Sequence, residues 1–528
     1  MKQSILLLKN NLFYSVCGVW IIGLIFRLFY FDATIPLSMD ALSFFTYSAD
    51  ITSIGKLPTN YDIAKPGWSY FLAIFFSIFN FEYTMQYMQL QKLLAISISS
   101  LTIFPLFFLI KKFSETKYTL LAVLIFAVEP KIIQNSLSGN SESIFIFFLV
   151  LTMLLFLNKN NKIIYLSFLF AGIASIIRPE GLFLFIGISI SYIIKFRKTR
   201  FVIPKYIFGL LIFILILTPV EIHKQQEGMY DSFFLRLYFN LFEYNSYNEK
   251  TRETISSSEQ VDSSKKNSNL FISTIEHFFK YLGWVLIPLF IILAPTGFIL
   301  FFKNFNTEKL SILILTILMT LPALYAYSLP LFELKYLYFL FPMFCIFITF
   351  SLKPIFEKFK KNNILFLIFF IIILSSSILF TDYKFDYQKE HDAVIIAKYV
   401  VKNTQVINEY YPESVYISGI QIVDKWKNYQ ASFQNIERIP GIKNSHDSII
   451  IVINANEYET LDSFLINSGN KKITHLILDD SNTQPDFLNE IFYDEQKYDF
   501  IEKIYDSQDN NLEYHVKIFR VNDSYKNE

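Results

Sequence analysis

The sequence LFYSVCGVWIIGLIFRLFYF at residues 12–31 is an apolar run that is long enough to cross the hydrocarbon core of a bilayer. It lacks the small-residue cleavage site of a secretory signal peptide, so we expect it to remain as a membrane anchor. The stretch MDALSFFTY follows at residues 39–47, and KPGW follows at residues 65–68. An acid, Asp40, and a lysine, Lys65, on one loop at a membrane surface suggest chemistry on a lipid-linked substrate.

The composition of the whole chain is that of a membrane protein. It has 528 residues, of which 53% are hydrophobic, and its mean hydropathy is +0.37. A soluble protein of this size carries more charge and fewer long apolar runs. The net charge of +1 gives no electrostatic case for binding nucleic acid. The two cysteines, Cys17 and Cys345, fall within apolar spans, so we expect no disulfide framework.

Hydropathy predicts about eleven membrane-spanning helices, and therefore a polytopic α-helical membrane protein. Each segment has about the length that a bilayer core requires. The predicted spans cover residues 12–31, 88–110, 118–133, 142–157, 163–178, 180–194, 203–220, 281–302, 310–328, 336–351 and 364–381.

The basic residues of the short connecting loops predict the orientation of these spans. They fall in alternate loops, which we expect to lie in the cytoplasm together with the N-terminus. The pattern holds only if the apolar run 66–80 does not cross the bilayer. We therefore predict a helix in the outer interface there, with Trp68 and Tyr70 at headgroup level. The residues that set the pattern are Lys2, Lys9, Lys111, Lys112, Lys117, Lys159, Lys162, Lys195, Arg197, Lys198, Arg200, Lys303, Lys309, Lys353, Lys358, Lys360 and Lys361.

This orientation divides the chain into two predicted domains. Residues 1–381 form the transmembrane domain, in which the loop 32–87, with interfacial helices, and the polar loop 221–280 lie on the outer side. We expect the second of these loops to be partly disordered. Residues 382–528 are polar and charged, and we expect them to form a small extracytoplasmic α/β domain. Its predicted helices cover about 388–402 and 485–504, and its predicted strands cover 414–418, 449–453, 473–478 and 513–521.

Each polar residue at an outer boundary has an ordinary structural explanation when it is taken alone. Asp40 and Glu142 sit where an acid stabilises a helix N-terminus, and Lys65, Lys131 and Arg178 can extend to the lipid headgroups. All five lie at the outer ends of the first several spans, where an ionisable group is costly unless it pairs or faces a wet cavity. Two acids and three bases around one cavity suit an anionic lipid phosphate and a hydroxyl acceptor.

Several short motifs, in their order along the chain, resemble those of the membrane-embedded GT-C glycosyltransferases. The stretch DALSFFTYSAD at residues 40–50 is similar to their first-loop motif, and Lys65-Pro66-Gly67 looks like a lysine-proline element later on that loop. The branch most resembled is the group of protein O-mannosyltransferases and aminoarabinose transferases (glycosyltransferase family 39-like), of the archaeal type. The further motifs are Pro130-Lys131, Asn135-Ser136, Ser141-Glu142, Arg178-Pro179-Glu180-Gly181, Glu333-Leu334-Lys335-Tyr336 with Pro342, and the tail around 500–521.

The resemblance covers about residues 12–350 and, more loosely, the tail. The family often has Asp-Glu where this chain has Asp40-Ala41, so the second acid of that pair is missing. Gly67 stands in place of a second proline, and Lys335 stands where the family usually has arginine. The chain contains no Trp-Trp-Asp-Tyr-Gly element, which counts against transfer of an oligosaccharide to asparagine.

The resemblance implies a GT-C fold and transfer of a sugar from a polyprenyl (dolichyl) phosphate to an acceptor hydroxyl, usually with inversion. The acceptor is a protein Ser/Thr, a lipid or a glycan, and the sequence leaves this choice, the sugar, the prenyl length and the oligomeric state open. In this scheme Asp40 is the general base. Lys65 and Arg178, with Lys131 third, hold the leaving phosphate, and Glu142 binds sugar hydroxyls or orients a cation.

Four further residues of the matching motifs, Tyr47, Glu333, Lys335 and Tyr336, are candidates for substrate binding. We expect no metal and no cofactor. The first outer loop has no Asp-x-Asp, and the six histidines form no ligand-spaced pair. Cationic side chains can instead neutralise the phosphate.

Two other classes of protein stay open. A transporter or flippase for lipid-linked sugars would carry polar residues toward the bilayer midplane, whereas the candidate charges here gather at one face. A non-catalytic membrane assembly protein would act through its tail, in which the sequence offers no recognisable catalytic or metal motif.

Overall fold

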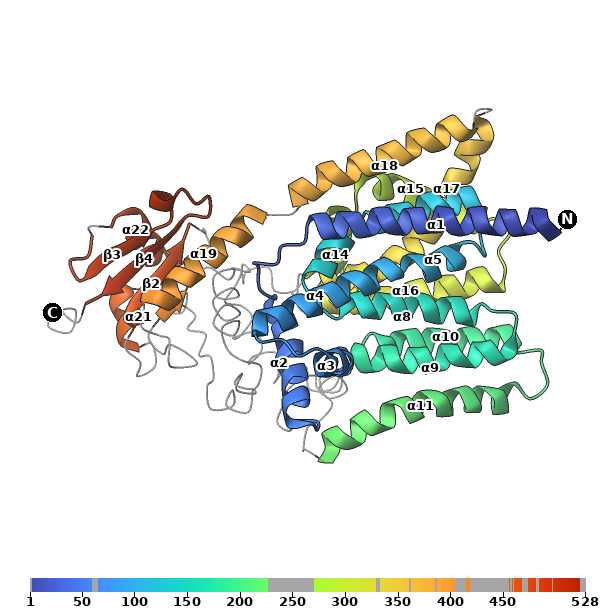
Figure 1. The fold of residues 1–528 in the computed structure, drawn as a ribbon, viewed down its shortest axis with the longest axis horizontal. Coiled ribbons are helices and arrows are strands. Elements are labelled where there is room, and N and C mark those ends of the chain that lie inside the picture. Colours follow the sequence, from blue (N-terminus) through green and yellow to red (C-terminus); the bar gives the residue numbers. More distant parts are fainter. Residues whose placement is uncertain are drawn as a thin grey trace.

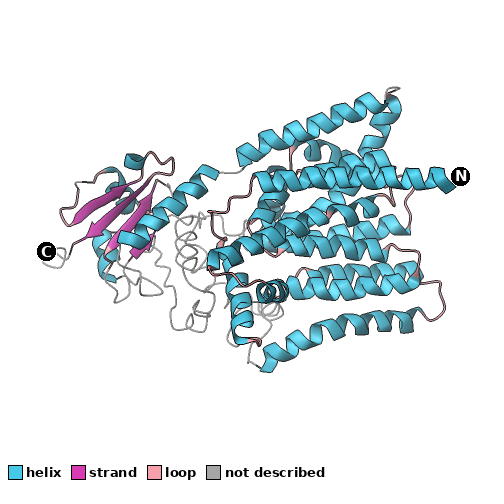
Figure 2. Cartoon of the chain, in the orientation of Figure 1, coloured by secondary structure: helices cyan, strands magenta, loops and turns pink. Residues whose placement is uncertain are grey.

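The computed structural model describes most of the first 403 residues and several shorter pieces after them. Figure 2 shows that helices make up the N-terminal part and that the strands belong to the C-terminal part. The described residues are 2–58, 65–226, 270–328, 333–359, 362–384, 387–403, 415–417, 455, 458, 460–467, 473–480, 484–495 and 497–522.

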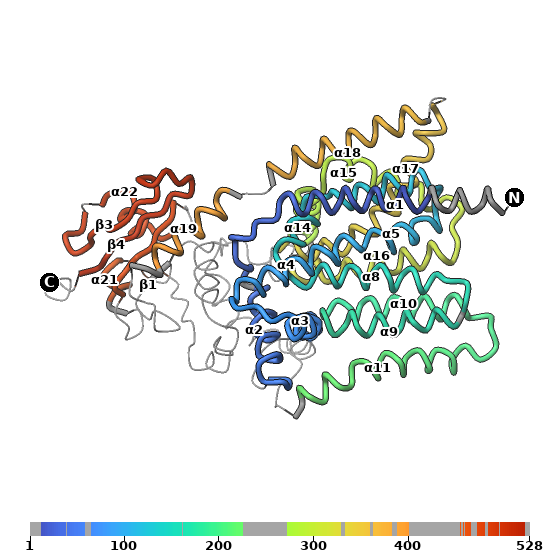
Figure 3. The backbone as a smooth tube through the Cα atoms, in the orientation of Figure 1, coloured from blue at the N-terminus to red at the C-terminus, as the bar shows by residue number. Residues whose placement is uncertain are grey.

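The N-terminal part is a bundle of helices that run side by side, and the N-terminus lies at the end of the bundle opposite the sheet (Figure 1). The helices are α1 Lys2–Phe29, α2 Met39–Ile54, α3 Gly67–Ile78, α4 Thr84–Leu101, α5 Ile103–Ile110, α6 Thr116–Ala127, α7 Pro130–Leu137, α8 Glu142–Phe156, α9 Asn161–Ile177, α10 Gly181–Phe196, α11 Val202–Gln226, α14 Leu270–Val285, α15 Pro288–Phe301, α16 Thr307–Ser328, the 3₁₀ helix η2 Leu334–Leu340, α17 Phe341–Lys358, α18 Asn362–Lys384 and α19 Tyr387–Asn403. The path of the backbone through them is followed in Figure 3.

The helices of the bundle differ in their capacity to cross a membrane. By length and composition, six in the described part of the chain can cross a bilayer, and the bent pair α6 and α7 makes a seventh if it counts as one span. The six are Leu12–Phe29, Thr84–Ile110, Val202–Lys224, Thr307–Ser328, Leu334–Lys358 and Asn363–Asp382.

The remaining predicted spans also coincide with helices, but these are shorter than a bilayer crossing needs. α8, α9, α10 and α15 have 15, 17, 16 and 14 residues, against about 20 for a span perpendicular to the membrane. The eleven predicted spans therefore all coincide with helices, and four of these helices are shorter than the six long ones. The chain is a multi-pass membrane protein with several short apolar helices packed among longer ones.

α2 and α3 lie across the end of the bundle rather than along it. Figure 1 shows α3 nearly end-on, whereas α8, α9 and α10 run across the picture. This arrangement agrees with the prediction of a helix at 66–80 that does not cross the bilayer. Within this helix the Trp68 ring is fully buried in the protein, and its Nε1 donates to the Gly139 carbonyl at 3.0 Å.

The break between α6 and α7 is a bend of 48° inside the bundle. Side chains from two distant helices satisfy the carbonyls that the break releases. Arg27 of α1, which is fully buried, donates to the Ala127 carbonyl at 2.7 Å, and Ser377 of α18 donates to the Val128 carbonyl. Irregular backbone at membrane depth is tolerated where neighbouring protein groups satisfy it, so these two contacts hold the break in place.

The predicted outer loop 221–280 is shorter at both ends than expected. α11 continues through Pro219 to Gln226, and α14 already begins at Leu270. The predicted partial disorder of this loop concerns mainly residues 227–269, which lie outside the described residues.

The C-terminal part contains a four-stranded sheet in the order β1-β2-β4-β3. β1 pairs with β2 in parallel, whereas β4 pairs antiparallel with both β2 and β3. The predicted small α/β domain is therefore present. Its described elements are β1 Val415–Ile417, α21 Leu461–Asn467, β2 His475–Asp479, α22 Asp486–Tyr493, β3 Ile501–Asp506, the 3₁₀ turn η7 Gln508–Asn510 and β4 Val516–Val521.

One predicted element of this domain is wrong and another lies outside the described residues. The helix expected at 485–504 is α22 in its first part and strand β3 in its last residues. The pairing of β3 with β4 shifts in register between Lys503 and Tyr505. The burial pattern of β3 therefore does not alternate residue by residue, and the segment lacks the period-2 pattern that predicts a strand. The strand expected at 449–453 lies outside the described residues.

α19 joins the sheet to the bundle. Its buried Asp392 accepts hydrogen bonds from the backbone N–H groups of Glu513 and Tyr514 at 2.8 and 3.1 Å. Tyr514 donates its hydroxyl to Asp479 at 2.9 Å, and burial together with this carboxylate raises the pKa of Tyr514. On the bundle side, Asp382 of α18 accepts a hydrogen bond from Tyr30 at 3.0 Å.

Candidate functional site

Asp40 forms an ion pair with Lys335, which is distant from it in sequence. Its Oδ2 lies 2.7 Å from the Nζ of Lys335, and the same ammonium also pairs with Glu333. The lysine side chain is 23% exposed, whereas those of Asp40 and Glu333 are 59% and 51% exposed. A largely buried ammonium therefore bridges two carboxylates that water and a substrate can reach.

A single glutamine fixes the helix that carries Asp40. Asp40 lies in the first turn of α2, where the helix dipole favours an acid. Gln91 of α4 donates its side-chain amide to the Ala41 carbonyl at 3.0 Å and to the Gly139 carbonyl at 2.9 Å. Because Trp68 also donates to Gly139, this one carbonyl ties α3 and α4 to the loop before α8.

Gly139 is required for this junction by its conformation and by its surroundings. Its φ of +78° lies in the left-handed region that favours glycine. A Cβ atom there would also stand 2.9 Å from the Leu37 side chain. The loop with Gly139 therefore passes close to the segment that leads into α2, and α8 begins just after it at Glu142.

Glu142 belongs to a second, more deeply buried ion-pair group. Arg178 Nη1 lies 2.5 Å from Glu142 Oε1, and its Nη2 lies 2.9 Å from Glu180 Oε1. Its Nε also donates to Glu180 Oε2 at 3.2 Å, so this pair is bidentate. Both carboxylates are almost fully buried, and Glu142 Oε2 has no hydrogen-bond partner among the described residues.

The Arg178-Pro179-Glu180-Gly181 motif is the tight turn between α9 and α10. A Cβ at Gly181 would lie 2.4 Å from the Ser175 backbone nitrogen, so the turn has room for glycine alone. This tightness places Arg178 and Glu180 beside each other. The guanidinium also stacks over the Phe339 ring, with 5.2 Å between its Cζ and the ring centroid.

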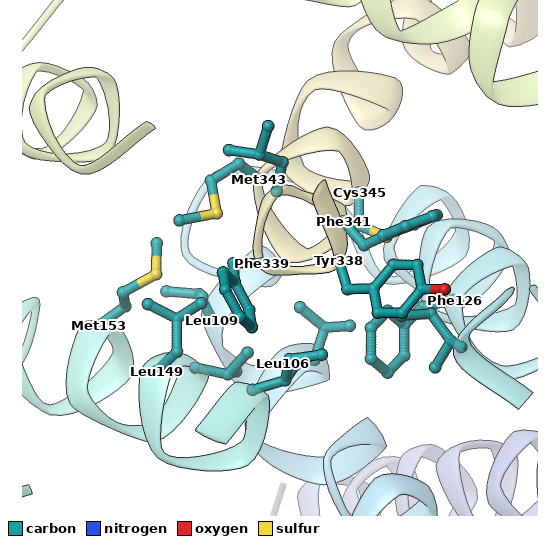
Figure 4. Packing of buried hydrophobic residues seen from close by; sticks show 14 of the residues in the cluster. Leu106, Leu109, Phe126, Leu149, Met153, Tyr338, Phe339, Phe341, Met343 and Cys345 are labelled. Atoms are coloured by element: carbon teal, nitrogen blue, oxygen red, sulfur yellow. The ribbon is translucent and has the colours of Figure 1, made fainter. Parts of the chain in front are cut away.

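The 3₁₀ helix η2 connects the two ion-pair groups. Lys335 is its second residue, and the next residue, Tyr336, lies within electrostatic reach of both Lys335 and Arg178. Phe339, near its end, is buried in the core, where its ring meets that of Phe145 at 4.7 Å. Figure 4 shows Phe339 pointing into the apolar cluster beside Leu109 and Leu149.

Lys65 is buried and pairs with Glu221 at the end of α11, at 3.2 Å. The segment that carries it packs closely on the end of α9. A Cβ at Gly67 would lie 2.9 Å from the backbone carbon of Ile176, two residues before Arg178. This contact explains why Gly67 stands where the resembled family has a proline. It also brings the segment that carries Lys65 next to the Arg178 turn.

The remaining candidates lie nearby in the fold but make contacts of their own. Lys131, in α7, donates to Gln134 in the same helix at 2.7 Å. Tyr47 is buried in α2, with its ring 6.2 Å from that of Tyr70. The residues described include no group of three or more His, Cys, Asp or Glu side chains that could hold a metal ion.

The structure thus brings the predicted residues into two joined groups and leaves others apart. Asp40, Glu333 and Lys335 form one group, and Glu142 with Arg178 forms the other. Sequence reasoning missed three partners as site residues: Glu180, Glu221 and Gln91. Glu180 belongs to the Arg178-Pro179-Glu180-Gly181 motif, so the sequence did offer a signal for it. No local sequence signal marks Glu221 or Gln91.

The charges of the two groups limit their chemistry. Four carboxylates face two cations, Lys335 and Arg178, so the groups together carry a formal charge of −2. Carboxylates of this kind accept hydrogen bonds from hydroxyl groups of a sugar or an acceptor. A phosphate needs additional positive charge, and Lys65 and Lys131 are the predicted residues that carry it.

One family model matches this part of the chain. Residues 64–223 match the model of dolichyl-phosphate-mannose-protein mannosyltransferase, which is 160 of the 528 residues. The matched segment includes Lys65, Lys131, Glu142 and Arg178. The comparison with curated proteins gives no match.

Solved structures extend the likeness to nearly the whole chain. The oligosaccharyltransferase of Archaeoglobus fulgidus in its apo form matches with a TM-score of 0.53 and 13% identity, over 89% of this chain and 69% of that one. ArnT from Cupriavidus metallidurans, bound to undecaprenyl phosphate, matches with a TM-score of 0.47 and 9% identity, over 98% of both chains.

The chain is therefore a multi-pass membrane protein with the GT-C fold. The predicted resemblance to the GT-C superfamily of glycosyltransferases is confirmed. Within that superfamily, the segment of the dolichyl-phosphate-mannose-protein mannosyltransferase model is the part that this sequence shares most clearly.

Proposed function

We propose that this protein transfers a glycosyl group, with inversion, from a polyprenyl-phosphate sugar to an acceptor hydroxyl on the extracytoplasmic face. The observation that carries the proposal is the family match over residues 64–223, because this segment contains the candidate residues Lys65, Lys131, Glu142 and Arg178. The family description favours dolichyl-phosphate mannose as the donor and a protein serine or threonine as the acceptor. A lipid or glycan acceptor is the alternative.

Asp40 is the proposed general base. An acceptor hydroxyl is a weak nucleophile at neutral pH, and a positioned carboxylate that takes its proton typically contributes about 10²–10⁴ in rate. The Asp40 side chain is exposed, and its ion pair engages Oδ2. The other oxygen, Oδ1, would accept the proton while the hydroxyl attacks the anomeric carbon and polyprenyl phosphate leaves.

Lys65 is the first proposed ligand of the leaving phosphate, and Lys131 is the second. A cation is most effective where charge develops in the transition state. Arg178 is the weaker candidate, because two buried carboxylates already hold its guanidinium. We assign it the role of fixing Glu142, whose second oxygen would bind a sugar hydroxyl.

The proposed orientation places the N-terminus in the cytoplasm and the sheet domain outside the cell membrane. The site residues lie at the end of the bundle where α2 and α3 cross it, which is also the end nearer the sheet (Figure 1). The basic loops support this orientation through the positive-inside rule. A lipid-linked donor would then reach the site from the outer leaflet.

The test is transfer by the purified protein. Dolichyl-phosphate mannose and other defined polyprenyl-phosphate sugars are incubated with the protein and a serine- and threonine-rich peptide, or with a lipid acceptor. Sugar-labelled acceptor and released polyprenyl phosphate in equal amounts support the proposal. Movement of the donor across vesicle membranes without any transfer would instead identify a transporter.

A further inference from the structure

We propose that Lys335 is a positioning residue for Asp40: its ammonium, held between Asp40 and Glu333, fixes the orientation of the Asp40 carboxylate. This inference rests on the proposed function, in which Asp40 is the base. It replaces the expectation that Lys335 and Glu333 bind substrate directly.

The first support is the rigidity of the segment that delivers the ammonium. The ammonium comes from η2, a 3₁₀ helix of seven residues that leads directly into α17. Leu337, Phe339 and Leu340 are buried in the core and anchor it. Lys335 therefore extends from a fixed base and is itself largely buried, whereas its two carboxylate partners are the exposed members.

The second support is the charge that surrounds the ammonium. Lys335 contacts two carboxylates, so the three side chains together carry a formal charge of −1. This surplus of negative charge disfavours a phosphate at the same ammonium. Without the ammonium, Asp40 and Glu333 would repel each other, and the Asp40 side chain would lose the contact that holds it. The arrangement suits a base whose orientation matters, because a base must lie within hydrogen-bond reach of the proton it takes.

The third support comes from the contacts of the Asp40 carboxylate itself. Within the described part of the chain, the side-chain hydrogen bond that reaches it comes from Lys335 Nζ to Oδ2, at 2.7 Å. The ion pair with Lys335 is the contact that fixes its direction. Glu333 holds the lysine from its other side, as the orienting group holds the base in other catalytic arrangements.

The experiment compares Lys335→Met, Lys335→Arg and Glu333→Gln in the transfer assay. Loss of a hydrogen bond to a charged group typically costs about 10–100-fold. We expect a fall of that size in kcat for Lys335→Met, a donor KM within about twofold of wild type, and partial recovery in Lys335→Arg. Lys353→Met is the matched control, because Lys353 makes an exposed ion pair with Glu357 elsewhere on α17. A raised donor KM with unchanged kcat would make Lys335 a donor ligand and overturn the proposal.

A second measurement does not depend on activity. The melting temperatures of Asp40→Asn, Lys335→Met and the double variant form a thermodynamic cycle. We expect the double variant to lose less than the sum of the two single losses, because each single change breaks the same contact. Additive losses would overturn the inferred contact. Absence of transfer by the wild-type protein would overturn the proposed function instead, so the two failures are distinguished.

Discussion

Lys335 Nζ and Asp40 Oδ2 lie 2.7 Å apart, although 295 positions separate the two residues in the chain. The group around Asp40 in α2 is therefore completed by the segment that enters α17. This contact also accounts for the missing acid at position 41. Ala41 is fully buried and its carbonyl accepts from Gln91, so a glutamate side chain has no room there, and Glu333 supplies the second carboxylate near Asp40.

Changes to the two members of the Lys65–Glu221 pair should affect the donor KM differently. Lys65→Ala removes a proposed phosphate ligand and should raise the donor KM by about 10–100-fold, as expected for loss of a hydrogen bond to a charged group. Glu221→Gln removes the carboxylate that holds the lysine 3.2 Å away, and should leave the donor KM equal or lower. Steady-state kinetics with varied donor measure both. Equal increases in the two variants would mean that the pair is structural.

The buried Arg27 should contribute to stability rather than to chemistry. Arg27→Met leaves the Ala127 carbonyl without its donor at the break of α6 and should lower the free energy of unfolding by about 1–3 kcal/mol. Thermal unfolding in detergent measures this. Ser97→Ala is the matched control, since Ser97 is exposed and its hydroxyl donates to the Leu93 carbonyl within its own helix. An unchanged melting temperature for Arg27→Met would contradict this account of the break.

Gly139 and Gly18 form a matched pair of glycines. Gly139→Ala places a Cβ at a φ of +78° and 2.9 Å from the Leu37 side chain, and should cost at least about 1 kcal/mol. It should also lower transfer, because the loop positions Glu142. Gly18→Ala lies in α1 with no atom within 4 Å of the added Cβ, and should be neutral or slightly stabilising. Melting temperatures and transfer rates test both, and equal behaviour would contradict the role of the Gly139 turn.

Much of the fold could be predicted because its signals are local. Apolar runs mark the helices of the bundle, and the charges between them mark the connections. The run 142–157 is an example, because α8 covers Glu142–Phe156. The contacts that hold the loop before α8 were not predictable in this way. Trp68 and Gln91 both donate to the Gly139 carbonyl, and no sequence signal tells a lipid-facing indole from one bonded to a carbonyl.

The sequence predicted which residues belong to the site, but it did not predict which of them form ion pairs with one another. The motifs placed Asp40, Glu142 and Arg178 on the outer side, which follows from topology. The pairing of Asp40 with Lys335, and of Lys65 with Glu221, arises from packing between segments far apart in sequence. Charge pairing across such separations has no periodic or compositional signature.

The central claim is that Asp40 acts as the base of a glycosyl transfer. The most direct measurement is the transfer rate of Asp40→Asn with dolichyl-phosphate mannose and a serine- and threonine-rich peptide. Asp462→Asn is the control, because Asp462 is an exposed acid in the first turn of another helix, α21. We predict that Asp40→Asn loses about 10²–10⁴ in kcat while its donor KM changes little, and that the control keeps wild-type turnover. Wild-type turnover in Asp40→Asn would contradict the account and leave Asp40 with the role of a helix-end charge.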